Sequence, residues 1–233
     1  MNELGNAFST AFSLISGLDP ALVEIVTLSL RVSLTAVVIA AVIGLPAGAA
    51  LAVFKFPGRR VVVVTIGALM GLPPVVVGLG VYLALSRSGP LGVLDLLFTP
   101  TAMIIAQVVL ITPIIIALSR QIIETMWEEY AEQLRSLGAG PWRSVPTLLW
   151  DARHGLMTVV LAGFGRASAE VGAVMIVGGN INHATRVMTT AIALETSKGD
   201  LALAMGLGIV LMMLSLGVNA AVHLINEVSI GRE

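Results

Sequence analysis

The chain contains 233 residues, of which 57% are hydrophobic and 12% charged, and its formal net charge is −1. Soluble globular domains carry about 25% charged residues. A mean hydropathy of +0.97 therefore excludes an ordinary soluble domain and places the chain in a lipid bilayer. The sequence has no cysteine, which excludes disulfides, thiolate metal sites and cysteine nucleophiles. We expect no nucleic-acid partner.

The amino-terminal segment, residues 1–20, is expected to lie on the membrane surface. Residues 4–18 are uncharged but too short to cross a bilayer. Their apolar side chains follow helical spacing and predict an amphipathic helix, with disorder as the alternative. No Lys or Arg precedes them, which argues against a signal peptide. The residues on the apolar face are Leu4, Phe8, Ala11, Phe12 and Ile15.

Five apolar segments are long enough to cross the hydrocarbon core as helices. None shows the alternating polarity of a membrane barrel. The sequence therefore predicts an all-α membrane protein with a single transmembrane domain over residues 21–226. The predicted spans are approximately 30–54, 61–86, 98–119, 155–179 and 201–226.

Basic residues predict the orientation of these spans. Eight of the thirteen Lys and Arg residues lie in the first loop, the third loop and the carboxyl-terminal tail. Because basic loops stay on the cytoplasmic side, we expect a multi-pass protein of the cell membrane with its amino terminus outside and its carboxyl terminus inside. The third loop, residues 120–154, is then cytoplasmic.

Pro73 and Pro74 interrupt the helical hydrogen bonds of the second span. They predict a static kink, with a moving gate as the alternative.

In the fourth span, Arg166 and Glu170 have the i, i+4 spacing that places two side chains on one helical face. Charges at membrane depth are costly unless they pair or face a wet cavity. We expect a structural ion pair or a polar lining of a transport path.

The cytoplasmic loop has the pattern of two helices joined by a tight turn. Apolar residues recur at steps of three and four in the first helix, Gly138 and Gly140 can end it, and Pro141 suits the start of the second. Pro146 is expected to bend the second helix. Such a hairpin either holds the spans together or inserts into a cleft on a soluble partner. Its apolar residues are Ile123, Trp127, Tyr130, Leu134 and Leu137, followed by Trp142, Val145, Leu148 and Leu149.

The sequence lacks the motifs of an ATPase or of a serine hydrolase. It contains neither a GxxxxGK[ST] loop nor a Gly-x-Ser-x-Gly elbow. His154, His183 and His223 lie in separate regions, so we expect no metal site. Energy for transport would come from a partner or from an ion gradient. An ion-driven transporter would usually show two similar halves with ionisable residues at the midplane.

Two segments resemble known permeases. Residues 132–138, EQLRSLG, with Pro141 and Trp142 after them, resemble the EAA loop of ABC-importer permeases, which docks on an ATP-binding subunit. Gln133 and Leu134 replace the two alanines of that motif, and Trp150-Asp151 stands where Leu-Pro is expected. Residues 165–173, GRASAEVGA, resemble a segment of the sulfate, molybdate and tungstate permeases, and the chain is most similar to tungstate permeases.

This resemblance implies a type I ABC-importer permease for a tetrahedral oxyanion, with tungstate as the expected substrate. A molybdate or sulfate importer is the nearest alternative, and an ion-driven transporter is a more distant one. The resemblance also implies a homodimer, two ATP-binding subunits that hold the ATP and Mg, an external binding protein, and no cofactor or catalysis in this chain. ATPase contacts are expected at Glu132, Gln133, Leu134, Gly138, Pro141 and Trp142. A path or gate is expected at Pro73, Pro74, Arg166, Glu170, Asn180, Thr189 and Thr190. For Asn180, Thr189 and Thr190, and for Arg186 beside them, solvation of an ordinary loop is an equally good explanation.

Overall fold

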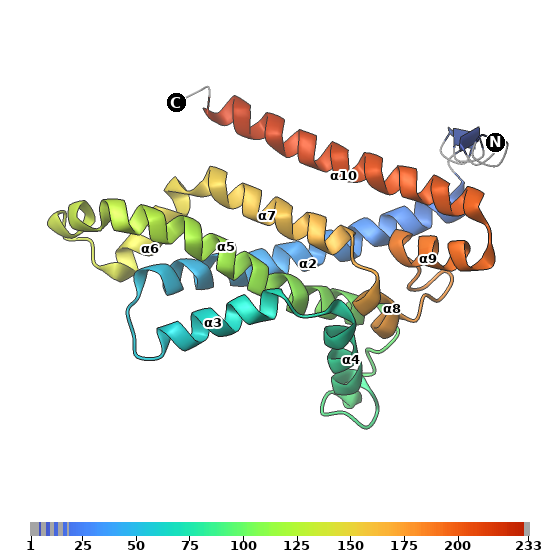
Figure 1. Cartoon of the computed structure of the whole chain (residues 1–233), viewed down its shortest axis with the longest axis horizontal. Helices are drawn as coiled ribbons and strands as arrows, with labels where there is room; N and C mark the ends of the chain where they lie inside the picture. Colours follow the sequence, from blue (N-terminus) through green and yellow to red (C-terminus); the bar gives the residue numbers. More distant parts are fainter. Residues whose placement is uncertain (1–4, 6–7, 10–11, 14–15, 18, 231–233) are drawn as a thin grey trace. The chain divides into compact units, whose positions relative to one another are not determined.

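The computed structural model describes all residues except 1–4, 6–7, 10–11, 14–15, 18 and 231–233 (Figure 1). The described residues form helices joined by turns and contain no strand, which confirms the predicted all-α fold. The predicted surface helix over residues 1–20 falls largely outside the described residues. The helices are α2 (Pro20–Val53), α3 (Arg59–Met70), α4 (Pro74–Leu85), a 3₁₀ turn η1 (Gly92–Leu94), α5 (Pro100–Ser136), α6 (Pro141–Asp151), α7 (Arg153–Ser168), α8 (Gly172–Gly178), α9 (Met188–Lys198) and α10 (Leu201–Ile230).

The chain divides into two compact units. The first unit contains residues 1–35, 74–107 and 168–233, and the second contains residues 36–73 and 108–167. Helices α2 and α5 each begin in the first unit and end in the second. The elbow expected from the cytoplasmic loop belongs to the second unit.

Three described helices, α2, α5 and α10, are long and apolar enough to cross a membrane. Two pairs of shorter helices, α3 with α4 and α7 with α8, bring the number to five if each pair forms one span. The predicted spans 61–86 and 155–179 are therefore interrupted rather than continuous. Conversely, α2 and α5 are longer than predicted, since α2 begins at Pro20 and α5 continues to Ser136.

The break at Pro73 and Pro74 separates two helices instead of bending one. Helix α3 ends at Met70, and the Gly71 N–H closes its last turn on the Ala68 carbonyl at 3.1 Å. Pro74 is the first residue of α4, where the missing N–H costs no helical hydrogen bond. The two prolines thus prevent α3 from continuing into α4.

Helix pairs in the first unit approach closely. Helix α4 packs on α8, and α9 packs on α10. A Cβ added at Gly78 of α4 would lie 2.6 Å from the Cα of Ala173 in α8, so only glycine permits this approach. The Ser29 hydroxyl accepts a hydrogen bond from the Met188 N–H at 2.8 Å, which ties the start of α9 to α2.

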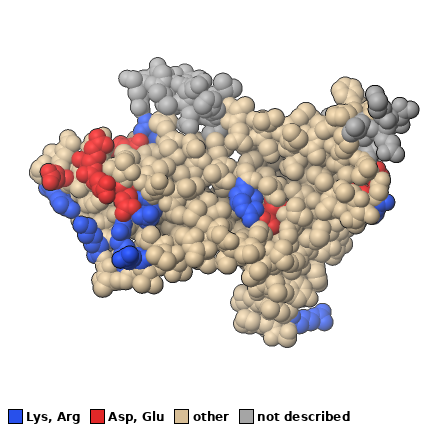
Figure 2. All heavy atoms as spheres, in the orientation of Figure 1, with Lys and Arg blue, Asp and Glu red and all other residues tan. Residues whose placement is uncertain are grey.

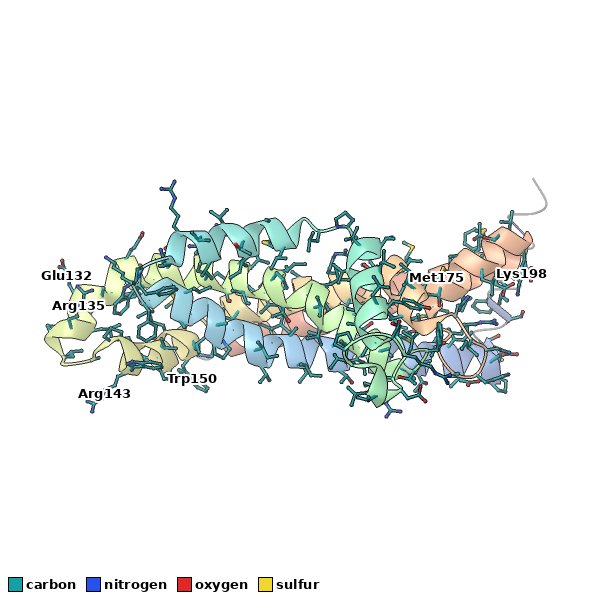
Figure 3. All side chains as sticks on the ribbon, turned by 90° about the horizontal axis from the view of Figure 1, so that it is seen from below. Glu132, Arg135, Arg143, Trp150, Met175 and Lys198 are labelled. Atoms are coloured by element: carbon teal, nitrogen blue, oxygen red, sulfur yellow. The ribbon has the colours of Figure 1, made fainter. Side chains whose placement is uncertain are left out.

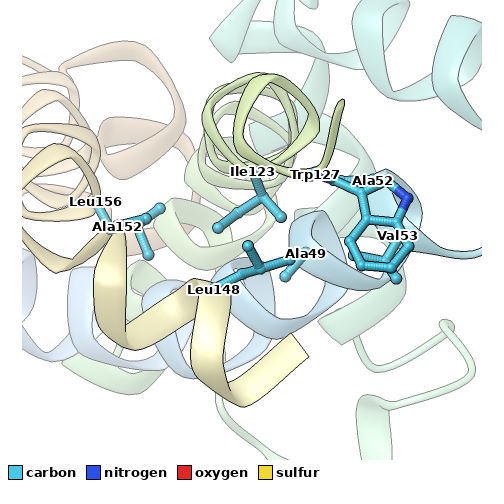
Figure 4. Packing of buried hydrophobic residues seen from close by; sticks show 8 residues of the cluster. All are labelled: Ala49, Ala52, Val53, Ile123, Trp127, Leu148, Ala152 and Leu156. Atoms are coloured by element: carbon cyan, nitrogen blue, oxygen red, sulfur yellow. The ribbon is translucent and has the colours of Figure 1, made fainter. Parts of the chain in front are cut away.

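The second unit packs around one apolar cluster contributed by α2, α5, α6 and α7 (Figure 4). Helices α2 and α5 touch where α2 carries Gly44 and Gly48. A Cβ at Gly44 would lie 2.7 Å from Cγ2 of Ile115, and one at Gly48 would lie 2.7 Å from the Ile116 carbonyl oxygen. The cluster consists of Ala49, Ala52, Val53, Ile123, Trp127, Leu148, Ala152 and Leu156.

We expect Gly48→Ala to lower the stability of the second unit. The new methyl group would meet backbone atoms of α5, including the Arg120 nitrogen at 2.9 Å, which cannot rotate away as a side chain can. Overpacking of this kind costs about 1–3 kcal/mol. Thermal unfolding of the detergent-solubilised protein, followed by size-exclusion chromatography, measures the loss.

Gly208→Ala in α10 is the matched control for this substitution, because its added Cβ meets no described atom within 4 Å. Alanine favours helix more than glycine does, so this variant should be at least as stable as the wild type. Equal unfolding temperatures for the two variants would contradict the close approach of α2 and α5.

Candidate functional site

The elbow, residues 132–142, joins the end of α5 to the start of α6. Its base is rigid because the preceding turns of α5 are buried. Ile123 is fully buried and Trp127 is only 6% exposed, and both belong to the apolar cluster that also contains Ala49 and Val53 of α2 and Leu148 of α6 (Figure 4). The elbow is therefore held by side-chain packing on both of its arms.

The turn itself has the backbone that the sequence predicts. Gly138 has a φ of +79°, a left-handed conformation that favours glycine. The Ala139 N–H donates to the Leu134 carbonyl at 2.9 Å, which closes the end of α5. Gly140 is extended and Pro141 begins α6. The predicted helix–turn–helix is confirmed, and α6 continues through Pro146 to Asp151.

The apolar stripe of the loop divides into a buried half and an exposed half. Leu134 still packs against the cluster of the second unit. Leu137 is 76% exposed and Trp142 is 81% exposed, although the Trp142 ring lies 4.7 Å from the Phe54 ring between centroids. The near half of the stripe therefore holds helices together, and the far half is exposed to solvent.

Charged side chains surround this exposed ridge of Leu137 and Trp142. Acidic and basic residues gather at the elbow end of the second unit (Figure 2). Glu132 and Arg135 lie on the last turns of α5, and Arg143 lies across the turn on α6 (Figure 3). The Arg135 guanidinium is 5.5 Å from the centroid of the Trp127 ring, which orients it over the buried base. An apolar ridge with charged flanks suits insertion into a groove of a soluble protein.

Two of the predicted contact residues differ in exposure. Gln133 is exposed beside Glu132, whereas Leu134 is half-buried against the cluster. The leucine that replaces alanine in the motif therefore has a packing role. Phe54, which contacts Trp142 from the end of α2, was not predicted, because no local pattern in the sequence connects residues so far apart.

The expectation that Arg166 and Glu170 share one helical face is wrong. Helix α7 ends at Ser168, and Glu170 lies in the break before α8. One Glu170 carboxylate oxygen accepts a hydrogen bond from the Ala173 N–H at 3.0 Å, in the first turn of α8. A buried carboxylate at a helix start satisfies backbone donors and is stabilised there by the helix dipole.

The remaining predicted polar residues lie together in the first unit, but their hydroxyl groups bond within the chain. The Thr189 hydroxyl donates to the Glu170 carbonyl at 2.8 Å. Thr190 is fully buried, and its hydroxyl donates to the Val187 carbonyl at 3.1 Å at the start of α9. The Asn180 amide donates to the Thr190 carbonyl at 3.3 Å. These contacts give the three residues a structural role around α9.

The chain matches a known protein family over most of its length. A family model described as the binding-protein-dependent transport system inner membrane component matches residues 40–229. A tungstate uptake system permease protein of Peptoclostridium acidaminophilum is 40% identical over 97% of this chain and 100% of its own length. A probable anion ABC transporter permease protein of Haloferax volcanii is 43% identical over 85% of this chain and 88% of its own.

A molybdenum transport system permease protein of Azotobacter vinelandii is 31% identical over 54% of this chain and 62% of its own length. The family match covers all of the second unit beyond residue 39, including both arms of the elbow. The apolar helices and this match together show that the chain is a multi-pass membrane protein that belongs to the family of binding-protein-dependent transport system inner membrane components.

Proposed function

We propose that the chain is the membrane subunit of an ATP-driven importer for tungstate. The exposed ridge of Leu137 and Trp142, set on a buried base, is the observation that carries the proposal. It offers a separate ATP-binding subunit a compact apolar contact with charged flanks. Two related proteins, from Peptoclostridium acidaminophilum and Campylobacter jejuni, are named as tungstate uptake system permease proteins, which supports the choice of anion.

In this proposal two copies of the chain form one path through the cytoplasmic membrane. Two ATP-binding subunits hold the ATP and Mg and grip the elbows from the cytoplasm, and a binding protein delivers the anion from outside. The chain itself catalyses no reaction. The basic loops support an elbow on the cytoplasmic side, with the amino terminus outside and the carboxyl terminus inside.

The second unit would act as the moving body. Helix α5 runs without a break from Pro100 to Ser136, and 37 residues of helix span about 55 Å at 1.5 Å per residue. A displacement of the elbow is therefore passed along α5 and, through the shared cluster, to α2 and α7. Such rigid-body movement of packed helices underlies alternating access.

The breaks at Pro73–Pro74 and around Glu170 lie where the chain passes from one unit to the other. We propose that these breaks absorb the movement, since backbone angles can change at a break without loss of helical hydrogen bonds. Asn180 and Thr189, which are both half-buried, would then border the path. A molybdate or sulfate importer is the nearest alternative, because relatives of this chain are named for those transport systems.

Trp142→Ala should abolish ATP-dependent uptake while leaving the fold intact. The ring is mostly exposed and makes one described ring contact, with Phe54, so its loss costs the isolated chain little. Truncation of a central aromatic residue at an interface costs about 2 kcal/mol or more, which weakens binding about 30-fold. Co-purification of the ATP-binding subunit and uptake into proteoliposomes measure the two effects.

Val93→Ala is the control for the loss of an exposed apolar side chain, since Val93 is 93% exposed and belongs to the first unit rather than to the elbow. It should retain both the partner and the uptake. The importer proposal fails if uptake still depends on ATP and proceeds at the wild-type rate after residues 132–142 are scrambled.

Gly138→Ala tests the turn separately from the ridge. Alanine at a left-handed position costs about 1 kcal/mol. Gly199, with a φ of +84°, provides a matched control, because at both positions an added Cβ meets no described atom. Both variants should lose similar stability, but only Gly138→Ala should reduce the transport per ATP hydrolysed. Equal transport by the two variants would remove the turn from the coupling mechanism.

The choice of anion is tested on the binding protein that works with this permease. Calorimetric titration with tungstate, molybdate and sulfate should give the lowest Kd for tungstate, and competition between the anions in the uptake assay should follow the same order. A lower Kd for molybdate or sulfate would reassign the substrate and leave the ATP-driven mechanism unaffected.

A further inference from the structure

A group of basic residues at the start of α3 is organised by one carboxylate. Glu124 of α5 accepts a hydrogen bond from Nη2 of Arg59 at 2.6 Å, and its other oxygen accepts one from Arg120, one turn earlier on α5. Nε of Arg59 donates to the Leu51 carbonyl at 2.7 Å. Glu124 thus holds two guanidinium groups next to each other and neutralises only one of the two charges.

The end of α2 and the start of α3 add positive charge. Lys55, between the two helices, and Arg60, in the first turn of α3, are both exposed, and residues 51–60 contain no acidic residue. This part of the second unit thus supplies four basic side chains, and both oxygens of Glu124 already bind two of them. Each guanidinium has five N–H donors, so Arg59 and Arg120 retain donors for a second anion.

An apolar groove begins at this basic group. It lies between α3 and α5, has a volume of about 250 Å³, and is lined by Val63, Ile66 and Met70 on one side and by Ile116 on the other. Arg120 lines the same groove, at the end where α3 begins, because it shares Glu124 with Arg59. None of the residues of α3 is buried, so this apolar helix leaves its side of the groove open.

We propose that the groove binds an anionic phospholipid. The phosphate would contact Arg120 and Arg59, and an acyl chain would lie along the stripe from Val63 to Met70. Arginine binds phosphate through paired N–H donors, and basic pockets between membrane helices bind anionic head groups. A free phosphate ion would leave the apolar groove unfilled, and a neutral lipid would leave the excess positive charge uncompensated. The site involves neither the transported anion nor the ATP-binding subunit.

Gly67 allows the groove to be filled without disturbing the fold. It lies in the groove wall, and an added Cβ would meet no described atom within 4 Å. Gly67→Leu should therefore occupy the space of the acyl chain. Arg120→Gln tests the head group, and Glu124 remains paired with Arg59 in that variant. Gly217→Leu, an equally open and exposed position in α10, is the matched control.

The delipidated full-length protein is mixed with equal amounts of phosphatidylglycerol and phosphatidylcholine, and native mass spectrometry counts the bound lipids. The wild type and Gly217→Leu should each retain more phosphatidylglycerol than phosphatidylcholine. Gly67→Leu and Arg120→Gln should each lower this retention about fivefold, the factor that corresponds to about 1 kcal/mol for one basic residue near a membrane surface.

Three results would overturn the proposal. Equal retention of the two lipids by the wild type would exclude a site for anionic lipid. Unchanged retention in Gly67→Leu would place bound lipid outside the groove. Conversion of a dimer to a monomer by Gly67→Leu would show that a second copy of the chain covers it. If Gly67→Leu does not fold, the test rests on Arg120→Gln. Unchanged retention of phosphatidylglycerol by that variant would then contradict the proposal.

Discussion

The apolar cluster around Ile123, Trp127 and Leu148 determines how the second unit presents its elbow. Helix α6 has 11 residues, and isolated helices shorter than about 12–15 residues are marginal in water. Its stability therefore depends on Leu148 packing against α2 and α5. Burial of one leucine side chain contributes about 1.5–3 kcal/mol, enough to fix α6 when several such contacts are combined. Without this cluster the exposed ridge would have no defined orientation.

The elbow was predictable because its signals are local. Gly138, Gly140 and Pro141 each require a particular backbone conformation, and the spacing from Ile123 to Leu137 identifies one face of a helix. The split of that face into buried and exposed halves was not predictable. The split depends on where α2 ends, because Val53 and Phe54 at that end pack against the loop. Both residues are distant from the elbow in the sequence.

The breaks within the second and fourth spans show a different limit. Residue hydropathy locates a segment of membrane length but does not indicate whether its helix is continuous. The i, i+4 spacing of Arg166 and Glu170 indicates a shared face only within one helix, and α7 ends between them. The Glu170 carboxylate accepts a hydrogen bond from the Ala173 N–H at the start of α8, because a buried polar group without a partner is costly. Pro73 and Pro74 gave the only local sign of a break.

The base of the elbow comes from two distant parts of the chain, residues 49–53 and residues 123–156. An exchange of residues 120–154 between two permeases would therefore join a foreign ridge to a native base, and Leu134, Trp127 and Leu148 would meet side chains of the wrong shape. A hybrid that keeps its fold has to exchange the end of α2 together with the loop. The structural element that has to be transferred as a whole is thus this packed cluster, whose parts are separated in the sequence, rather than the short loop motif alone.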